Sequence, residues 1–251
     1  IMIAEEGGIR PIVELIKSET VTPHENATRA IWHLSACADN KLSFARAGGI
    51  EPLVVLLSNG SEQAQEWAAA AMESLTHECH SNQMKPATIE GIGPLVMLLG
   101  AESEVTQDNA VHALLNISAT NTDNRNAVVK PLVDLLSVRN ATASMKSAQA
   151  LMMLAARSHA DRTSISDAGA VPPLVAMLGD GRNATTPQIR AAAVISDLAR
   201  SSENKAAIVK AGGVLPLVNM LSSKAQVAQV SASAAVAQLA ANTSAQKMIT
   251  D

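Results

Sequence analysis

The feature that most constrains this chain is a unit of about 42 residues that recurs six times. Each copy has a small-residue turn, usually containing glycine, followed by an apolar helix start with a proline near its beginning. The equivalent residues are Pro11, Pro52, Pro94, Pro131, Pro173 and Pro216, and the steps between them are 41, 42, 37, 42 and 43 residues. A fixed period in this range is typical of stacked helical repeats, in which each layer packs only against its neighbours. The repeat therefore predicts an all-α solenoid and favours a binding function.

Each period resolves into three helical segments, and the second copy shows them most clearly. A short helix over residues 40–47 ends at Gly48 and Gly49, because glycine can take the positive φ of a helix C-terminus. A second helix over 50–57 has proline in its first turn, where a missing N–H costs little. A longer third helix follows over 62–76, with small residues and leucine at i+3, i+4 and i+7 spacing.

Together these segments resemble the armadillo repeat. The segment 113–118, Ala-Leu-Leu-Asn-Ile-Ser, is a close match to that family's third-helix pattern at Asn116. The resemblance covers the whole chain and implies a right-handed superhelical solenoid of about six three-helix repeats, as a single domain over residues 1–251. HEAT repeats are the alternative architecture, but their two-helix unit does not call for a glycine stop before a third segment.

The fourth copy departs from the pattern. Asn124 to the equivalent Ala127 spans 3 residues, whereas the matching segment spans 8 in four other copies. Either the first helix of that layer is lost or the sequence omits a segment. We favour omission, which predicts an intact mass different from 26.0 kDa. Residues 1–6 and 247–251 resemble parts of further repeats, so we expect a piece of a longer array.

Composition excludes several functions. The chain is 47% hydrophobic but only 1% aromatic, so its core must be built from aliphatic side chains. A net charge of −4 and the absence of a Lys/Arg run argue against nucleic acid as a partner. No apolar stretch approaches the roughly 20 residues needed to span a bilayer. A lipid anchor upstream of Ile1, as in the vacuolar armadillo adaptors, stays open.

The two cysteines indicate a reducing compartment. Cys37 and Cys79 lie one repeat apart, so their helices should be about 8–10 Å from each other, too far for an unstrained bridge unless both side chains point inward. Reduced thiols fit a cytoplasmic protein, with the nucleus as an open alternative.

The resemblance also implies a binding site, because armadillo third helices line a concave groove in which extended partner peptides lie. Carried onto this sequence, the family's groove positions share one face of each third helix. The candidate residues are Asn26, Arg29, His33, Trp67, Ser74, Asn109, His112, Asn116, Lys146, Gln149, Arg190 and Asp197. The row formed by Asn109, His112 and Asn116 is the most polar and is the first choice. The alternative is that these are ordinary solvated helix positions.

The same positions bear on the subfamily. Importin-α-like proteins carry tryptophan four residues before the groove asparagine, where this chain has Arg29, Ala70 and His112 in its first three copies. An importin-like role is therefore not expected. β-Catenin-like and vacuolar adaptor-like arrays are the nearer resemblance, although the groove here lacks a strongly basic row and leaves the charge of the peptide open.

No motif indicates catalysis. Residues 77–80, His-Glu-Cys-His, hold three metal-ligating types, but no second cluster completes a zinc site, and a polar helix end is the simpler reading. We therefore expect a non-enzyme without metal or cofactor that binds other proteins as a scaffold or adaptor. Two alternatives stay open: a structural component of a cytoskeletal or ciliary assembly, and the substrate-recruiting half of a ubiquitin ligase. Bulky convex residues would favour the structural role, and Phe44 is the candidate.

Overall fold

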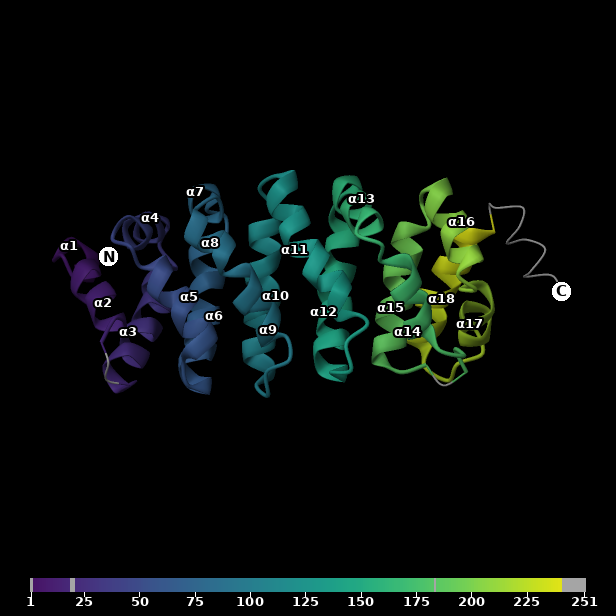
Figure 1. Cartoon of the computed structure of the whole chain (residues 1–251), viewed down its shortest axis with the longest axis horizontal. Coiled ribbons are helices and arrows are strands. Elements are labelled where there is room, and N and C mark those ends of the chain that lie inside the picture. Colours follow the sequence, from purple (N-terminus) through teal and green to yellow (C-terminus); the bar gives the residue numbers. More distant parts are fainter. Residues whose placement is uncertain (1, 19–20, 183, 241–251) are drawn as a thin grey trace. The chain divides into compact units, whose positions relative to one another are not determined.

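The computed structural model describes residues 2–18, 21–182 and 184–240, which form eighteen helices and no strand. Contacts between residues divide the chain into two compact units, residues 1–128 (unit 1) and 129–251 (unit 2). Each unit repeats the predicted order of a short helix, a second helix and a long third helix (Figure 1). The all-α repeat fold is therefore confirmed.

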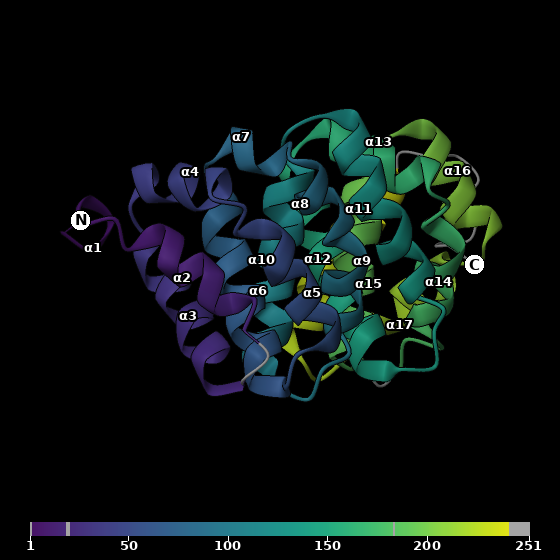
Figure 2. The ribbon, with the colours of Figure 1, turned by 60° about the vertical axis from the view of Figure 1, so that its left-hand side comes forward.

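In unit 1 the long third helices of successive layers lie side by side, α3 against α6 and α6 against α10 (Figure 2). The helices of this unit are α1 (Met2–Glu5), α2 (Ile9–Ile16), α3 (Val21–Leu34), α4 (Ala38–Arg46), α5 (Ile50–Asn59), α6 (Glu62–Thr76), α7 (His80–Gln83), α8 (Pro86–Glu90), α9 (Ile92–Leu98) and α10 (Glu104–Ser118).

In unit 2 the third helices α12, α15 and α18 are neighbours in the same way. Its helices are α12 (Ala141–Arg157), α13 (His159–Asp167), α14 (Val171–Leu178), α15 (Thr186–Leu198), α16 (Ser202–Lys210), α17 (Val214–Met220) and α18 (Gln226–Leu239). The remaining helix, α11 (Thr122–Leu135), begins in unit 1 and ends in unit 2. Helix α11 belongs to the irregular fourth layer. The segments expected as its first and second helices form one continuous helix that includes Pro131, because no glycine turn separates them.

Local signals set the helix boundaries. Helix α6 begins and ends at the predicted residues, and the Ser61 hydroxyl accepts a hydrogen bond from the Ala64 N–H at its start. Helix α4 ends in a Schellman motif, with the N–H of Gly49 donating to the Phe44 carbonyl and that of Gly48 to the Ala45 carbonyl. Gly48 has φ +76°, which explains the glycine at this position.

Alanine lets the third helices approach closely. Ala64, Ala68 and Ala71 of α6 are fully buried, and Leu75 and Met72 fill the space between the layers. Since the one phenylalanine and two tryptophans are the only aromatic residues, close packing of small side chains replaces large rings in the core.

Buried asparagines fasten two first helices of unit 1, α4 and α7, to the layers around them. The Asn82 amide donates to the Leu75 carbonyl at the end of α6, at 2.9 Å, and to the Lys41 carbonyl of the preceding first helix, at 3.1 Å. The equivalent Asn40 amide donates to the Leu34 carbonyl at 2.9 Å. These bonds satisfy carbonyls that a helix C-terminus leaves without an internal partner.

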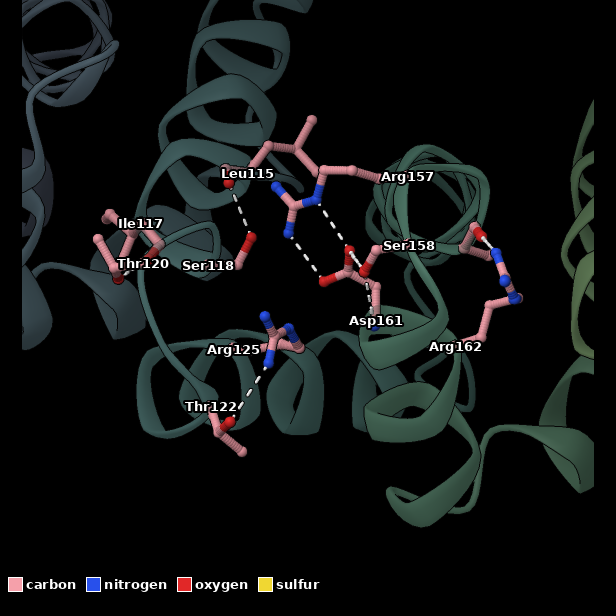
Figure 3. Close-up of polar contacts among 11 residues, drawn as sticks. Leu115, Ile117, Ser118, Thr120, Thr122, Arg125, Arg157, Ser158, Asp161 and Arg162 are labelled. Atoms are coloured by element: carbon pink, nitrogen blue, oxygen red, sulfur yellow. Dashed lines mark hydrogen bonds and ion pairs between the residues drawn. The ribbon is translucent and has the colours of Figure 1, made fainter.

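Unit 2 uses a carboxylate at one of these positions. Asp161, the equivalent of Asn82, accepts two hydrogen bonds from the Arg157 guanidinium, at 2.8 and 2.9 Å, and one from the Ser158 hydroxyl, at 2.6 Å (Figure 3). Asp161 is 1% exposed, so the ion pair compensates a buried charge. At the next layer the Asn204 amide again donates to a third-helix carbonyl, that of Leu198.

Candidate functional site

The candidate site of unit 1 is the face of α3, α6 and α10 that carries the predicted groove positions. Asn26, Arg29, His33 and His112 are exposed there, and Trp67, Ser74, Asn109 and Asn116 are half-buried. Because α6 packs against both α3 and α10, the structure brings these residues together on adjacent helices. The face therefore offers both solvated polar groups and partly covered apolar surface.

An aromatic cluster lies between α3 and α6. The indole rings of Trp32 and Trp67 have centroids 5.3 Å apart, and the His33 ring lies 4.3 Å from that of Trp32. The Arg29 guanidinium lies 5.9 Å from the centre of the Trp67 ring, within cation–π range. Both indoles are half-buried, so they are available as a flat apolar surface.

Sequence reasoning missed Trp32, since the family's groove positions on α3 are Asn26, Arg29 and His33. A signal was present: the chain has two tryptophans, and both occur in third helices of neighbouring copies. Two large rings on adjacent helices come into contact only when both point toward the other helix. The family's groove positions on each helix do not show which other side chains point that way.

The side chain of Asn116, one of the three residues predicted first as groove contacts, is hydrogen-bonded within the protein. Its amide donates to the Glu73 carbonyl at 3.2 Å and to the Thr76 hydroxyl at 3.4 Å, both at the end of α6. These bonds tie α10 to α6 and leave the amide less available to a partner. Within this row, the exposed His112 is the better candidate for contact.

In unit 2 the structure corrects one predicted residue. Lys146 is only 2% exposed, so it does not present its side chain on the surface of α12 as expected. Helix α12 is buried around most of its circumference, and Ala143, Ser147 and Ala150 beside Lys146 are also buried.

The other predicted residues of unit 2 are half-buried. The Arg190 guanidinium donates to the Met145 carbonyl at 3.1 Å, and Asp197 pairs with Arg200 at 2.9 Å. The Gln149 amide oxygen is buried and accepts no hydrogen bond. This face has no aromatic ring, and its polar side chains serve mainly to hold neighbouring helices.

The cluster at residues 77–80 lies beside a cavity of about 460 Å³, lined also by Lys41 and Leu42. The buried Lys41 ammonium donates to the His77 carbonyl at 2.6 Å, which caps the end of α6. Among the described residues, no group of three or more His, Cys, Asp or Glu side chains is arranged to hold a metal ion. Cys37 and Cys79 are both free thiols.

A polar cavity of about 320 Å³ in unit 2 lies between α13 and α16, lined by His159, Arg162, Arg200 and Glu203 among others. The backbone N–H of Glu203, followed by the hydroxyls of Ser202 and Ser201, lowers the pKa of the Glu203 carboxyl. The lining holds both acidic and basic side chains, Asp167, Asp197 and Glu203 against Arg162 and Arg200, so the cavity does not favour a ligand of one charge.

Some of the exposed apolar side chains lie on second helices of unit 1 and not at the predicted place. Phe44 is fully buried in the core, so it cannot serve the convex surface. Val55 of α5 and Met97 of α9 are instead 57% and 76% exposed. They line cavities of about 480 and 570 Å³ at equivalent positions of two successive layers.

None of the helices formed by the described residues is long and apolar enough to cross a membrane.

A family model described as Armadillo/beta-catenin-like repeat matches residues 201–241. The chain is also similar to solved structures of designed proteins. One is an engineered protein with 27% sequence identity over 93% of this chain and 97% of that protein, at a TM-score of 0.68. Another is a designed armadillo repeat protein in complex with the peptide (KR)4, with 24% identity, 92% and 99% coverage and a TM-score of 0.70.

A third similar structure is of computationally designed armadillo repeat proteins for modular peptide recognition. It has 26% identity to this chain, covers 92% of this chain and 99% of that one, and has a TM-score of 0.66. A comparison with curated proteins gives no match.

Proposed function

We propose that this chain, which contains a match to the armadillo repeat model and resembles designed armadillo repeat proteins, is a scaffold that holds an extended segment of a partner protein along its third helices. The observation that carries this proposal is the aromatic cluster on unit 1. Trp32, Trp67, Arg29 and His33 come from two helices and keep partly exposed apolar area beside solvated polar groups.

The mechanism follows from the chemistry of this face. An extended peptide has free backbone N–H and C=O groups, and the side chains of Asn26, Asn109 and His112 can donate to or accept from them. The paired indoles offer a rigid surface for one apolar or planar side chain of the peptide. Most of the binding energy of such an interface resides in a few large anchors, so Trp67 is expected to dominate.

The similar designed proteins support the proposal by analogy. One is described in complex with a peptide, and another is described as made for modular peptide recognition. We propose no catalytic role, and the scaffold or adaptor function requires no cofactor.

A selection experiment tests the proposal. A library of random peptides is selected on the chain, and the selected peptides are titrated by calorimetry against the parent protein, Trp67→Ala and His112→Glu. We expect Trp67→Ala to weaken binding by about 2 kcal/mol, typical of an aromatic anchor. His112→Glu should change affinity without changing the circular dichroism spectrum, since its side chain is exposed. Asn116 is left unchanged because it bonds α10 to α6.

Peptides that bind the parent and both variants equally would contradict the third-helix site. The matched control is the double variant Val55→Ser and Met97→Ser, which alters the second-helix surface of the same unit. This control should bind selected peptides as the parent does.

The same control tests a second candidate function, that of a structural component in a larger assembly. The exposed Val55 and Met97 side chains and their two equivalent cavities favour it. If the double variant alone loses the selected peptides, the second helices bind the partner and the structural role is the better assignment.

A further inference from the structure

A buried ammonium group in unit 1 has no carboxylate partner. Lys41 of α4 is 9% exposed, and within the part of the chain that the structure describes no Asp or Glu carboxylate lies within ion-pair distance of it. Its side chain donates one hydrogen bond there, to the His77 carbonyl at the C-terminus of α6. An ammonium has three N–H donors, and a helix C-terminus supplies only about half a negative charge. Part of the charge of Lys41 and two of its donors are therefore left for another group.

Other layers do not have an isolated charge at this position. The equivalent residue of the next layer is Gln83, which is neutral. The equivalent residue of unit 2 is Arg162, which is half-buried and lines the cavity between α13 and α16. That cavity also contains three carboxylates, those of Asp167, Asp197 and Glu203. Since a buried charge is costly unless a partner compensates it, Lys41 is the exception that calls for an explanation.

Lys41 lines the cavity of about 460 Å³ where α4 of one layer adjoins α7 of the next (Figure 2). Sites for small organic molecules in proteins have volumes of about 300–1,000 Å³. Ala36, Ala38 and Leu42 contribute apolar side chains to the same lining. The cavity therefore combines a cationic group with an apolar wall, which suits a ligand with a charged end and an aliphatic body.

The other polar side chains of the lining restrict the charge of this ligand. The His80 ring and the Ser81 hydroxyl can each donate a hydrogen bond to an anionic oxygen. Among the described lining residues Glu78 is the one acidic side chain, and it is exposed. Glu78 repels an anion, and more strongly as the charge of that anion rises. One ammonium beside one carboxylate therefore favours a ligand with a single negative charge over a phosphate ester, which carries up to about two.

We propose that this cavity binds a single carboxylate carried on a short aliphatic chain, with the carboxylate accepting hydrogen bonds from the Lys41 ammonium. The aliphatic chain lies against Ala36, Ala38 and Leu42. A small organic acid and the glutamate side chain of a partner protein share this chemistry. The site is formed by α4 and the turn between α6 and α7, so it is separate from the third-helix face and does not rest on the proposed function.

The test uses four probes with the same five-carbon chain and different end groups: pentanoate, pentanamide, pentylamine and pentyl phosphate. Each is titrated into the isotope-labelled chain, and the shifts of backbone N–H signals in nuclear magnetic resonance spectra give both affinity and location. The variants are Lys41→Met, which removes the charge but keeps a long side chain, and Glu78→Gln, which removes the repelling carboxylate. The matched control is Lys210→Met, which removes an exposed ammonium at the end of α16.

We expect pentanoate to bind more tightly than the other three probes and to shift most strongly the N–H signals of residues 38–42 and 77–81. Lys41→Met should weaken pentanoate at least about tenfold, as for loss of one partner of a buried charge pair. Glu78→Gln should strengthen it about two- to fivefold. Lys210→Met and Trp67→Ala should leave it unchanged. If circular dichroism shows that Lys41→Met does not fold, Glu78→Gln decides, since it leaves Lys41 in place.

Four results would overturn the inference: equal binding of pentanamide and pentanoate, tighter binding of pentyl phosphate, an unchanged affinity in both Lys41→Met and Glu78→Gln, or shifts confined to residues outside the cavity. A titration with the α-amide of N-acetylglutamic acid then distinguishes the two sources of the carboxylate. Tighter binding than pentanoate supports a glutamate side chain of a partner protein, and weaker binding supports a small organic acid.

Discussion

Asn82 of unit 1 and Asp161 of unit 2 occupy the same position of the repeat, yet they anchor their layers by opposite means. Asn82 donates through a neutral amide to two carbonyls, whereas the Asp161 carboxylate accepts hydrogen bonds from the Arg157 guanidinium and the Ser158 hydroxyl. Both side chains are buried. This position of the repeat therefore requires a buried side chain that forms hydrogen bonds. The side chain can be neutral or charged, provided that neighbouring groups complete its hydrogen bonds.

Exchanging the amide for the carboxylate gives the sharpest test of this comparison. Asn82→Asp buries a negative charge against the carbonyls of Leu75 and Lys41, and the residue that corresponds to Arg157 is Glu78. An uncompensated buried charge costs about 3–5 kcal/mol. We expect the free energy of unfolding to fall by this amount in urea denaturation followed by circular dichroism. A loss below about 1 kcal/mol would show that the position tolerates a charge without its own arginine.

The reciprocal change tests unit 2. Asp161→Ala leaves the Arg157 guanidinium without its carboxylate and should destabilise the protein by about 3 kcal/mol. Asp161→Asn should cost only about 1 kcal/mol, since an amide can still hydrogen-bond and Arg157 is 33% exposed and can reach water. Differential scanning calorimetry of the two variants shows which of them loses more stability. An equal loss from both would mean that the negative charge itself is required.

Two glycines with positive φ, one in each unit, differ in the space around them. Gly181 of unit 2 has φ +74°, and an added Cβ would lie 2.0 Å from the Pro216 carbonyl oxygen. Gly48 of unit 1 has a similar φ, but its nearest neighbour would be the Glu51 carboxylate at 3.9 Å. Gly48→Ala should therefore cost about 1 kcal/mol, from the strained φ alone. Gly181→Ala should cost more, and thermal unfolding that ranks them in reverse would contradict the contact with Pro216.

The smallest expected effect is the pH dependence from Glu203, at the start of α16 in unit 2. Its own backbone N–H and the hydroxyls of Ser202 and Ser201 lower its pKa from an ordinary value of 4.5. A lowered pKa means that this carboxylate stabilises the folded state above pH 4.5, and the contribution is lost as the pH falls below that value. Glu203→Gln should remove this part of the acid sensitivity of unfolding. An unchanged profile would show that Glu203 makes no such contribution.

The sequence predicts much of the fold because the repeat rests on local signals. Glycines able to take positive φ and the hydroxyl of Ser61 set the boundaries of α4 and α6 within one copy. The irregular fourth copy is visible as a shortened step, although the sequence alone does not show that its two helices join as α11.

The candidate site is less predictable because its geometry depends on contacts between copies. Asn116 matches a family pattern, but its bonds to Glu73 and Thr76 are set by how α10 packs on α6. Trp32 lies outside the predicted rows and gains its place only from contact with Trp67. Lys146 has the polarity of a surface residue, and the small residues around it explain why a position on α12 can be buried.

The placement of the aromatic rings also decides how this protein can be observed. Trp32 and Trp67 are the only tryptophans, and the chain has no tyrosine. Nearly all of its near-ultraviolet absorbance and intrinsic fluorescence therefore arises from the α3/α6 seam. Emission reports on unit 1 and on whatever covers the two indoles, without any added label. Unit 2 is dark in this signal, so a difference between fluorescence and circular dichroism melting curves would resolve the unfolding of one unit from that of the other.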